Sequence, residues 1–102
     1  IAVIDFDIHP SNGNFYSLKD DSRFHLTSWH LYHLGIFWPF SKDADYDTSK
    51  QQLFFPLNGS MNSEGDYLST MHHVVLPVLR EWKPEMILIS AGFDAGYYDI
   101  MM

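Results

Sequence analysis

Cysteine is absent from this chain of 102 residues, basic residues are few, and no hydrophobic run is long. Without cysteine, the segment forms neither a disulfide nor a thiolate metal site. The 6 Lys and Arg residues are scattered and are outnumbered by 13 Asp and Glu, so we expect no direct contact with nucleic acid, which needs a basic face. The apolar runs fall well short of the ~20 residues that cross a membrane, so we expect no membrane partner.

Aliphatic and aromatic residues, by contrast, are abundant. Hydrophobic residues make up 46% of the chain and aromatic residues 17%, which is enough for the core of one small globular domain. The chain begins at Ile1 rather than Met, inside an apolar run. We therefore expect residues 1–102 to be a piece of a larger fold.

Three apolar segments are predicted to form β-strands. They are residues 1–6, residues 24–29, which partly alternate between polar and apolar, and residues 86–90, a continuous apolar run. A continuous run predicts a strand buried on both faces, as in a parallel sheet covered by helices. With a helix before the last strand, these segments predict an α/β fold.

The strongest helix signal runs from Asp66 to Trp82. Apolar residues recur there at steps of three and four, and Ser63 followed by Asp66 is a capping pattern. Pro77 lies inside and should kink the helix or remove one hydrogen bond. The remaining chain is predicted to form a helical turn at 15–18, an aromatic loop at 35–40 and a polar surface excursion at 41–52.

Polar residues follow the first strand at intervals of two. Asp5, Asp7 and His9 share one face of a strand, and burying them without a cation is costly. Sites in parallel α/β sheets form beyond the carboxyl ends of strands, and Asp94 follows the last strand. If the two strands are neighbours, Asp7, His9 and Asp94 meet around one ion, which fits a catalytic zinc with an open fourth position.

Several blocks of the chain together resemble the zinc-dependent histone deacetylases, most closely their class II branch. The blocks fall in family order and cover nearly all of the chain: 5–9 with Asn12 and Gly13, 28–30, 35–39, 74–81 and 90–95. The resemblance implies a three-layer α/β fold with a parallel sheet, of the arginase and deacetylase type. It also implies that residues 1–102 are part of a histone deacetylase catalytic domain and an incomplete fragment of that fold.

The resemblance also assigns roles to individual residues. It implies that Asp7, His9 and Asp94 bind Zn²⁺. It implies a second, structural cation, usually K⁺, held by Asp5, the Ser28 hydroxyl and backbone carbonyls that include that of Trp29. The other assigned residues are Asn12, which orients a catalytic histidine, and the aromatic residues Trp38 and Phe37, which either wall the tunnel for the acyl-lysine chain or pack in the core.

The activity implied by the resemblance is hydrolysis of acetyl-lysine amides on histones or other proteins. Multiprotein corepressor-type complexes and a nuclear or cytoplasmic location are further expectations. The family's paired catalytic histidines and its carbonyl-polarising tyrosine have no counterpart within residues 1–102. We therefore expect the segment alone to be inactive.

Two other functions remain open on the residues. Pro10 and Ser11 replace a His and a Gly of the family pattern, which favours a degenerate deacetylase-like module that binds or scaffolds without catalysis. An apolar strand ending in Asp-Phe-Asp also resembles the aspartate-nucleophile phosphatases, in which Asp5 would attack phosphorus with Mg²⁺ bound. His9 and the 91–95 block have no place in the phosphatase scheme.

Overall fold

The strands of this protein form one parallel sheet. The computed structural model describes residues 1–47, 51–59 and 61–100. The sheet order is β3-β2-β1-β4, and every pairing between these strands is parallel. The strands are β1 (Ala2–Asp5), β2 (His25–Leu31), β3 (Gln52–Leu57) and β4 (Ile87–Ser90).

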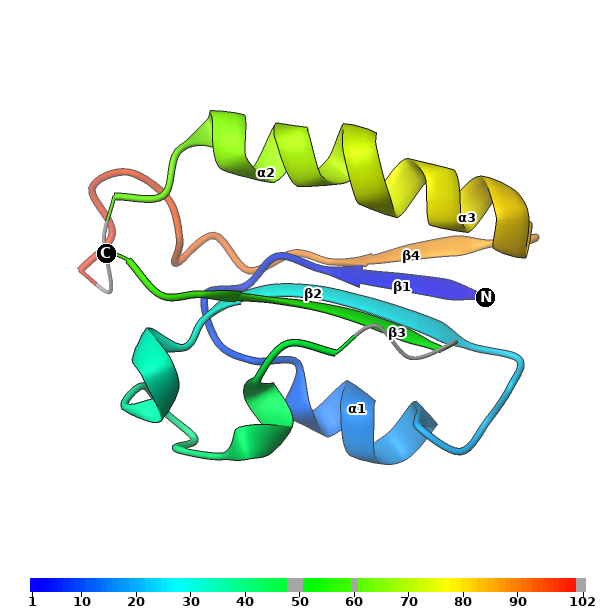
Figure 1. Cartoon of the computed structure of the whole chain (residues 1–102), viewed down its shortest axis with the longest axis horizontal. Coiled ribbons are helices and arrows are strands. Elements are labelled where there is room, and N and C mark those ends of the chain that lie inside the picture. Colours follow the sequence, from blue (N-terminus) through cyan, green and yellow to red (C-terminus); the bar gives the residue numbers. More distant parts are fainter. Residues whose placement is uncertain (48–50, 60, 101–102) are drawn as a thin grey trace.

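Helices cover both faces of the sheet, which gives three layers (Figure 1). Helix α1 (Asn12–Leu18) lies on one face. On the other face lies a longer helical stretch composed of α2 (Glu64–Thr70), the π-helical segment η3 (Met71–Val75) and α3 (Leu76–Trp82). The three-layer parallel α/β fold expected from the sequence is confirmed.

Alternate strand residues build a separate core on each face, as the period of a strand requires. Beneath α2, η3 and α3, the fully buried Trp29 packs with Ile4 and Val75. Beneath α1, Val3, Leu26 and Phe54 form a smaller cluster. Polar side chains on this second face therefore lie in or beside a core.

The predicted helix over 66–82 is present but interrupted. Ser63 is its N-cap, as expected, and the Asp66 side chain accepts the Ser63 backbone N–H at 2.7 Å, as in a capping box. Pro77 stands in the first turn of α3, directly after η3, so its missing N–H falls near a helix start, where prolines are tolerated. The α-helix is thus interrupted by a π-helical segment just before Pro77, where the proline predicted a kink or a lost hydrogen bond.

Some elements differ from the sequence expectation. Strand β3 was not predicted, because Pro56 inside it is unfavourable for a central strand, but β3 lies at the edge of the sheet, where proline is tolerated. Helix α1 begins at Asn12 rather than Phe15, since Ser and Asn favour helix starts as well as turns. Within the polar 41–52 region, the short 3-10 helix η2 (Lys42–Ala44) buries Ala44, whereas residues 48–50 lie outside the described part.

The expected burial of the last strand on both faces is wrong for the chain as described. Ile87, Leu88 and Ile89 are 51%, 47% and 55% exposed. The reason is position: β4 is an edge strand that pairs with β1 alone among the described residues.

In the same described part, no helix is both long and apolar enough to cross a membrane.

Candidate metal centre

The loops that follow β1 and β4 bring three candidate ligands together. The two strands are parallel neighbours with Asp5 paired to Ser90, so both chains leave the sheet at the same edge. One ligand atom each from Asp7, His9 and Asp94 lies within 4.8 Å of the others. The three residues proposed from strand-end position therefore occupy one cluster.

The His9 ring lies between the two carboxylates. Its Nδ1 is 2.8 Å from Asp7 Oδ1 and 2.9 Å from Asp94 Oδ2. A tetrahedral zinc with bonds near 2.0 Å separates its ligand atoms by roughly 3.3 Å, so the cluster would open by about half an ångström to receive the ion. Two carboxylates, one imidazole and a partly exposed setting fit a zinc with an open position.

Backbone amides fix the carboxylates in this arrangement. The N–H of Ile8 donates to Asp94 Oδ1 at 3.0 Å, which ties the β4 loop to the β1 loop. The N–H of His9 donates to Asp7 Oδ1 at 2.7 Å. Amide donors therefore hold both acids close to the histidine in the absence of an ion.

Gly92 leaves the space that the Asp7 side chain occupies. A Cβ atom at position 92 would lie 2.1 Å from Asp7 Oδ2 and 2.6 Å from Asp7 Cβ. Such distances are far inside van der Waals contact. The close approach of the two loops at the ligand cluster therefore requires glycine at this position.

The aromatic loop after β2 flanks the cluster on another side. The ring centroids of Phe37 and Trp38 lie 5.6 and 6.0 Å from that of His9. Trp38 is half exposed and borders an open depression of about 510 Å³ that also contains Asp7, His9 and Asn12. Both aromatic residues that were candidates for a tunnel wall thus lie beside a candidate ligand.

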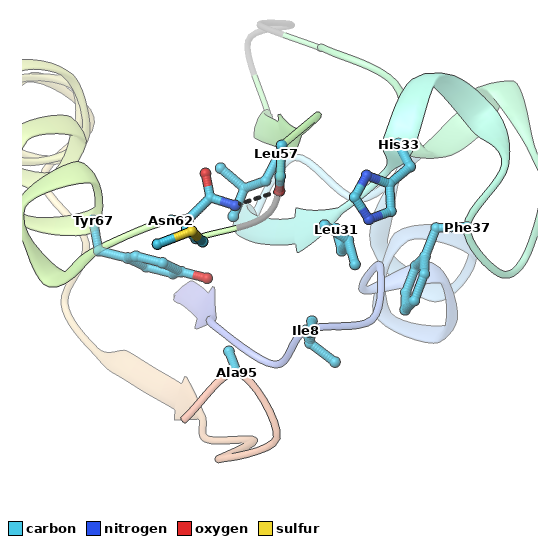
Figure 2. Close-up of a pocket in the computed structure, with 10 residues that line it drawn as sticks. Ile8, Leu31, His33, Phe37, Leu57, Asn62, Tyr67 and Ala95 are labelled. Carbon is cyan, nitrogen blue, oxygen red and sulfur yellow. Dashed lines mark hydrogen bonds between the residues drawn. The ribbon is translucent and has the colours of Figure 1, made fainter. Parts of the chain in front are cut away.

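A second hollow, lined mostly by apolar side chains, lies next to the metal loop (Figure 2). It measures about 390 Å³, and Ile8 and Ala95, the neighbours of the ligands, border it. Figure 2 shows Phe37 and Tyr67 on opposite sides of this hollow. Burial and the nearby Asp94 raise the pKa of Tyr67, so its hydroxyl keeps its proton. Sequence reasoning did not predict this hollow, because its walls come from four separate segments.

Asp5 is buried and already bonded, which removes the phosphatase reading. It is 5% exposed, its Oδ1 accepts the N–H of Asp7 at 3.1 Å, and its Oδ2 accepts the Ser11 hydroxyl at 2.6 Å. A carboxylate enclosed in this way cannot attack a phosphate from the solvent side. Asp5 instead faces Ser28 across the β1–β2 pairing.

Ser28 and His30 form a buried pair on the same face of the sheet as Asp5. His30 is fully buried, its Nε2 lies 2.6 Å from the Ala44 carbonyl oxygen, and its Nδ1 lies 2.8 Å from Ser28 Oγ. A carbonyl oxygen only accepts, so Nε2 carries the proton and the Ser28 hydroxyl donates to Nδ1. Burial lowers the pKa of His30, which agrees with a neutral ring.

The other histidines and Trp29 are placed as packing or surface residues. The Trp29 side chain lies on the opposite face from Ser28, and its Nε1 donates to Thr70 Oγ1 at 2.6 Å. His25 is buried against Trp82. His72 and His73 are exposed on η3. None of these histidines belongs to the ligand cluster of Asp7, His9 and Asp94.

Sequence comparison identifies relatives of this chain. A family model described as Histone deacetylase domain matches residues 1–102. The chain is 39% identical to the human protein named polyamine deacetylase HDAC10, over 97% of this chain and 16% of that protein. It is 37% identical to histone deacetylase 6 of Caenorhabditis elegans, over 93% of this chain and 11% of that protein. The chain therefore spans less than a fifth of either relative.

Solved structures share the fold. The structure of the histone deacetylase Clr3 matches with a TM-score of 0.92 at 28% identity, over 98% of this chain and 18% of that chain. The HD domain of HDA15 matches with a TM-score of 0.88 at 28% identity, over 98% of this chain and 30% of that one. With the family match over its whole length, this chain belongs to the histone deacetylase domain family.

Proposed function

We propose that this chain is the metal-binding part of the catalytic domain of a zinc-dependent deacetylase that hydrolyses acetyl-lysine amides on histones or other proteins. The observation that carries the proposal is the convergence of Asp7, His9 and Asp94 at one point. Two carboxylates and one imidazole leave a tetrahedral zinc one open position. The family match over residues 1–102 supports the same chemistry.

Each residue near the cluster has a separate task in this proposal. Zinc supplies Lewis-acid polarisation of the acetyl carbonyl and activation of the attacking water. Asp7, His9 and Asp94 hold the ion, and the amides of Ile8 and His9 keep the two carboxylates in place. Phe37 and Trp38, whose rings lie beside His9, contact the apolar stem of the acyl-lysine chain.

A structural K⁺ ion beside Asp5 and Ser28 is part of the proposal. The two residues face each other across β1 and β2 and are both buried. The Trp29 side chain points to the other face, so this residue would contribute its backbone carbonyl. Asn12, half-buried at the start of α1, would orient a catalytic histidine from another part of the protein.

Acetylated polyamines are a second candidate substrate class. The observation that favours them is the 39% identity to a relative named as a polyamine deacetylase. Both classes present an acetyl amide at the end of a flexible alkyl chain, so the same metal centre would serve either. Comparing kcat/KM of the intact protein on an acetyl-lysine peptide and on an acetylated polyamine decides between them.

Replacing Asp94 by alanine in the intact protein tests the metal assignment. We expect zinc content and turnover to be lost together, because the two remaining ligands hold the ion poorly. Asp20→Ala, which removes an exposed acid elsewhere, is the matched control and should keep both. Full zinc content in Asp94→Ala would overturn the assignment. Zinc binding by an unmutated protein that turns over neither substrate class would favour the non-catalytic module.

A further inference from the structure

Ser11 makes a buried hydrogen bond beside the metal centre. It is 5% exposed, and its Oγ lies 2.6 Å from Asp5 Oδ2 and 2.9 Å from Asn14 Nδ2. Asp5 is equally buried. A buried carboxylate oxygen without a donor is unfavourable, so the Ser11 hydroxyl satisfies a group that the fold has removed from water.

The direction of these hydrogen bonds follows from chemistry. A carboxylate only accepts, so the single hydroxyl proton of Ser11 goes to Asp5. The Ser11 oxygen is then free only to accept, and it does so from the side-chain amide of Asn14. On its other oxygen, Asp5 accepts the backbone N–H of Asp7 at 3.1 Å. A continuous line of donors and acceptors thus runs from helix α1 to the backbone of a candidate ligand.

We propose that Ser11 is a positioning residue of the metal centre. By holding Asp5, it fixes the acceptor for the Asp7 amide and so sets the direction in which the Asp7 carboxylate leaves the backbone. Asp7 Oδ1 must lie close to His9 Nδ1, which it does at 2.8 Å, and a small rotation of the Asp7 backbone would separate them. The inference rests on the proposed function in that Asp7 is taken as a zinc ligand.

The test compares Ser11→Ala, Ser11→Thr and Asn14→Ala with the unmutated intact protein. Zinc affinity is measured by competition with a chelator, and the visible spectrum of the Co²⁺-substituted protein reports the ligand geometry. For Ser11→Ala we expect zinc affinity to fall roughly 10- to 100-fold, as for other groups that orient metal ligands, with an altered Co²⁺ spectrum. Ser11→Thr keeps the hydroxyl and should restore most of the affinity.

Two comparisons keep the outcome decisive. Ser69→Ala, at an exposed serine of α2, is the control and should bind zinc normally. If Ser11→Ala fails to fold, Asn14→Ala replaces it as the deciding variant, with a smaller expected loss because Asn14 only orients Ser11. Unchanged zinc affinity and Co²⁺ spectrum in the folded variants would overturn the inference. Failure of the unmutated protein to bind zinc would instead reject the proposed function.

Discussion

Gly92 lies so close to the Asp7 side chain that adding a single methyl group at position 92 should weaken zinc binding. Gly92→Ala places a Cβ atom 2.1 Å from Asp7 Oδ2, so the carboxylate must move out of the cluster. We expect zinc affinity in the intact protein to fall at least roughly tenfold. Chelator competition measures this change.

Gly13→Ala is the matched control for this substitution. Gly13 lies in α1 close to the same centre, but a Cβ atom there would meet nothing within 4 Å. This variant should bind zinc as the unmutated protein does. Normal zinc binding by Gly92→Ala would mean that the Asp7 side chain has another productive orientation.

At the residue scale, the sequence predicted the candidate ligands but not the groups that hold them. Asp7, His9 and Asp94 could be predicted because a strand has a period of two and because sites gather at strand ends. The roles of Ser11 and Gly92 could not be predicted, since they lie in contacts between different segments of the folded chain. Such contacts depend on rotamers and loop paths that no spacing rule specifies.

A hydrogen bond between side chains joins β2 to α2. Trp29 Nε1 donates to Thr70 Oγ1 at 2.6 Å, in a core where Trp29 is 2% exposed. Thr70→Val keeps the shape but leaves the indole N–H without an acceptor. We expect the free energy of unfolding to fall by about 1–3 kcal/mol, measured by urea denaturation of the intact protein.

Thr70→Ser tests whether the hydroxyl is responsible. It retains the acceptor for Trp29 and should recover most of the stability lost in Thr70→Val. Unchanged stability of Thr70→Val would contradict the prediction, because that variant removes the hydroxyl but keeps the threonine methyl group.

At the scale of elements, prediction succeeded where periodicity was strong. The helix over 66–82 and the strands at either end of the chain were identified from their apolar patterns. Strand β3 was missed because it contains Pro56, which is unfavourable in a central strand. The exposure of β4 was missed because an apolar run looks the same in the sequence at the edge and at the centre of a sheet. Position within a sheet is a property of tertiary pairing, which local patterns do not contain.

Buried histidines link the stability of the whole molecule to pH. Burial lowers the pKa of both His25 and His30 in the folded state below the ordinary histidine value of about 6.5. Below that pH, these histidines bind protons in the unfolded chain but stay neutral in the folded chain. Stability is therefore retained above about pH 6.5 and falls as the pH drops, by at most about 1.4 kcal/mol per pH unit for each histidine.

His25→Phe should flatten this pH dependence. Among the residues that the structure describes, Nδ1 of His25 is buried without a hydrogen-bond partner, and the ring packs edge-on against Trp82, so a phenyl ring suits the site. Urea midpoints of the intact protein at pH 7.5 and 5.5 measure the effect. His72→Asn, at an exposed position, should leave the dependence unchanged, and an unchanged slope in His25→Phe would exclude His25 as a source.

The metal cluster also constrains the order in which the molecule forms. Ile8 and Asp94, joined by a hydrogen bond, are 86 residues apart in the sequence. The loops they belong to meet only after β4 has paired with β1, and such distant pairings form late because closing a long loop costs entropy. During synthesis, Asp7, His9 and Asp94 therefore cannot gather around an ion until β4 has docked on β1, so ion binding at this site follows that long-range pairing.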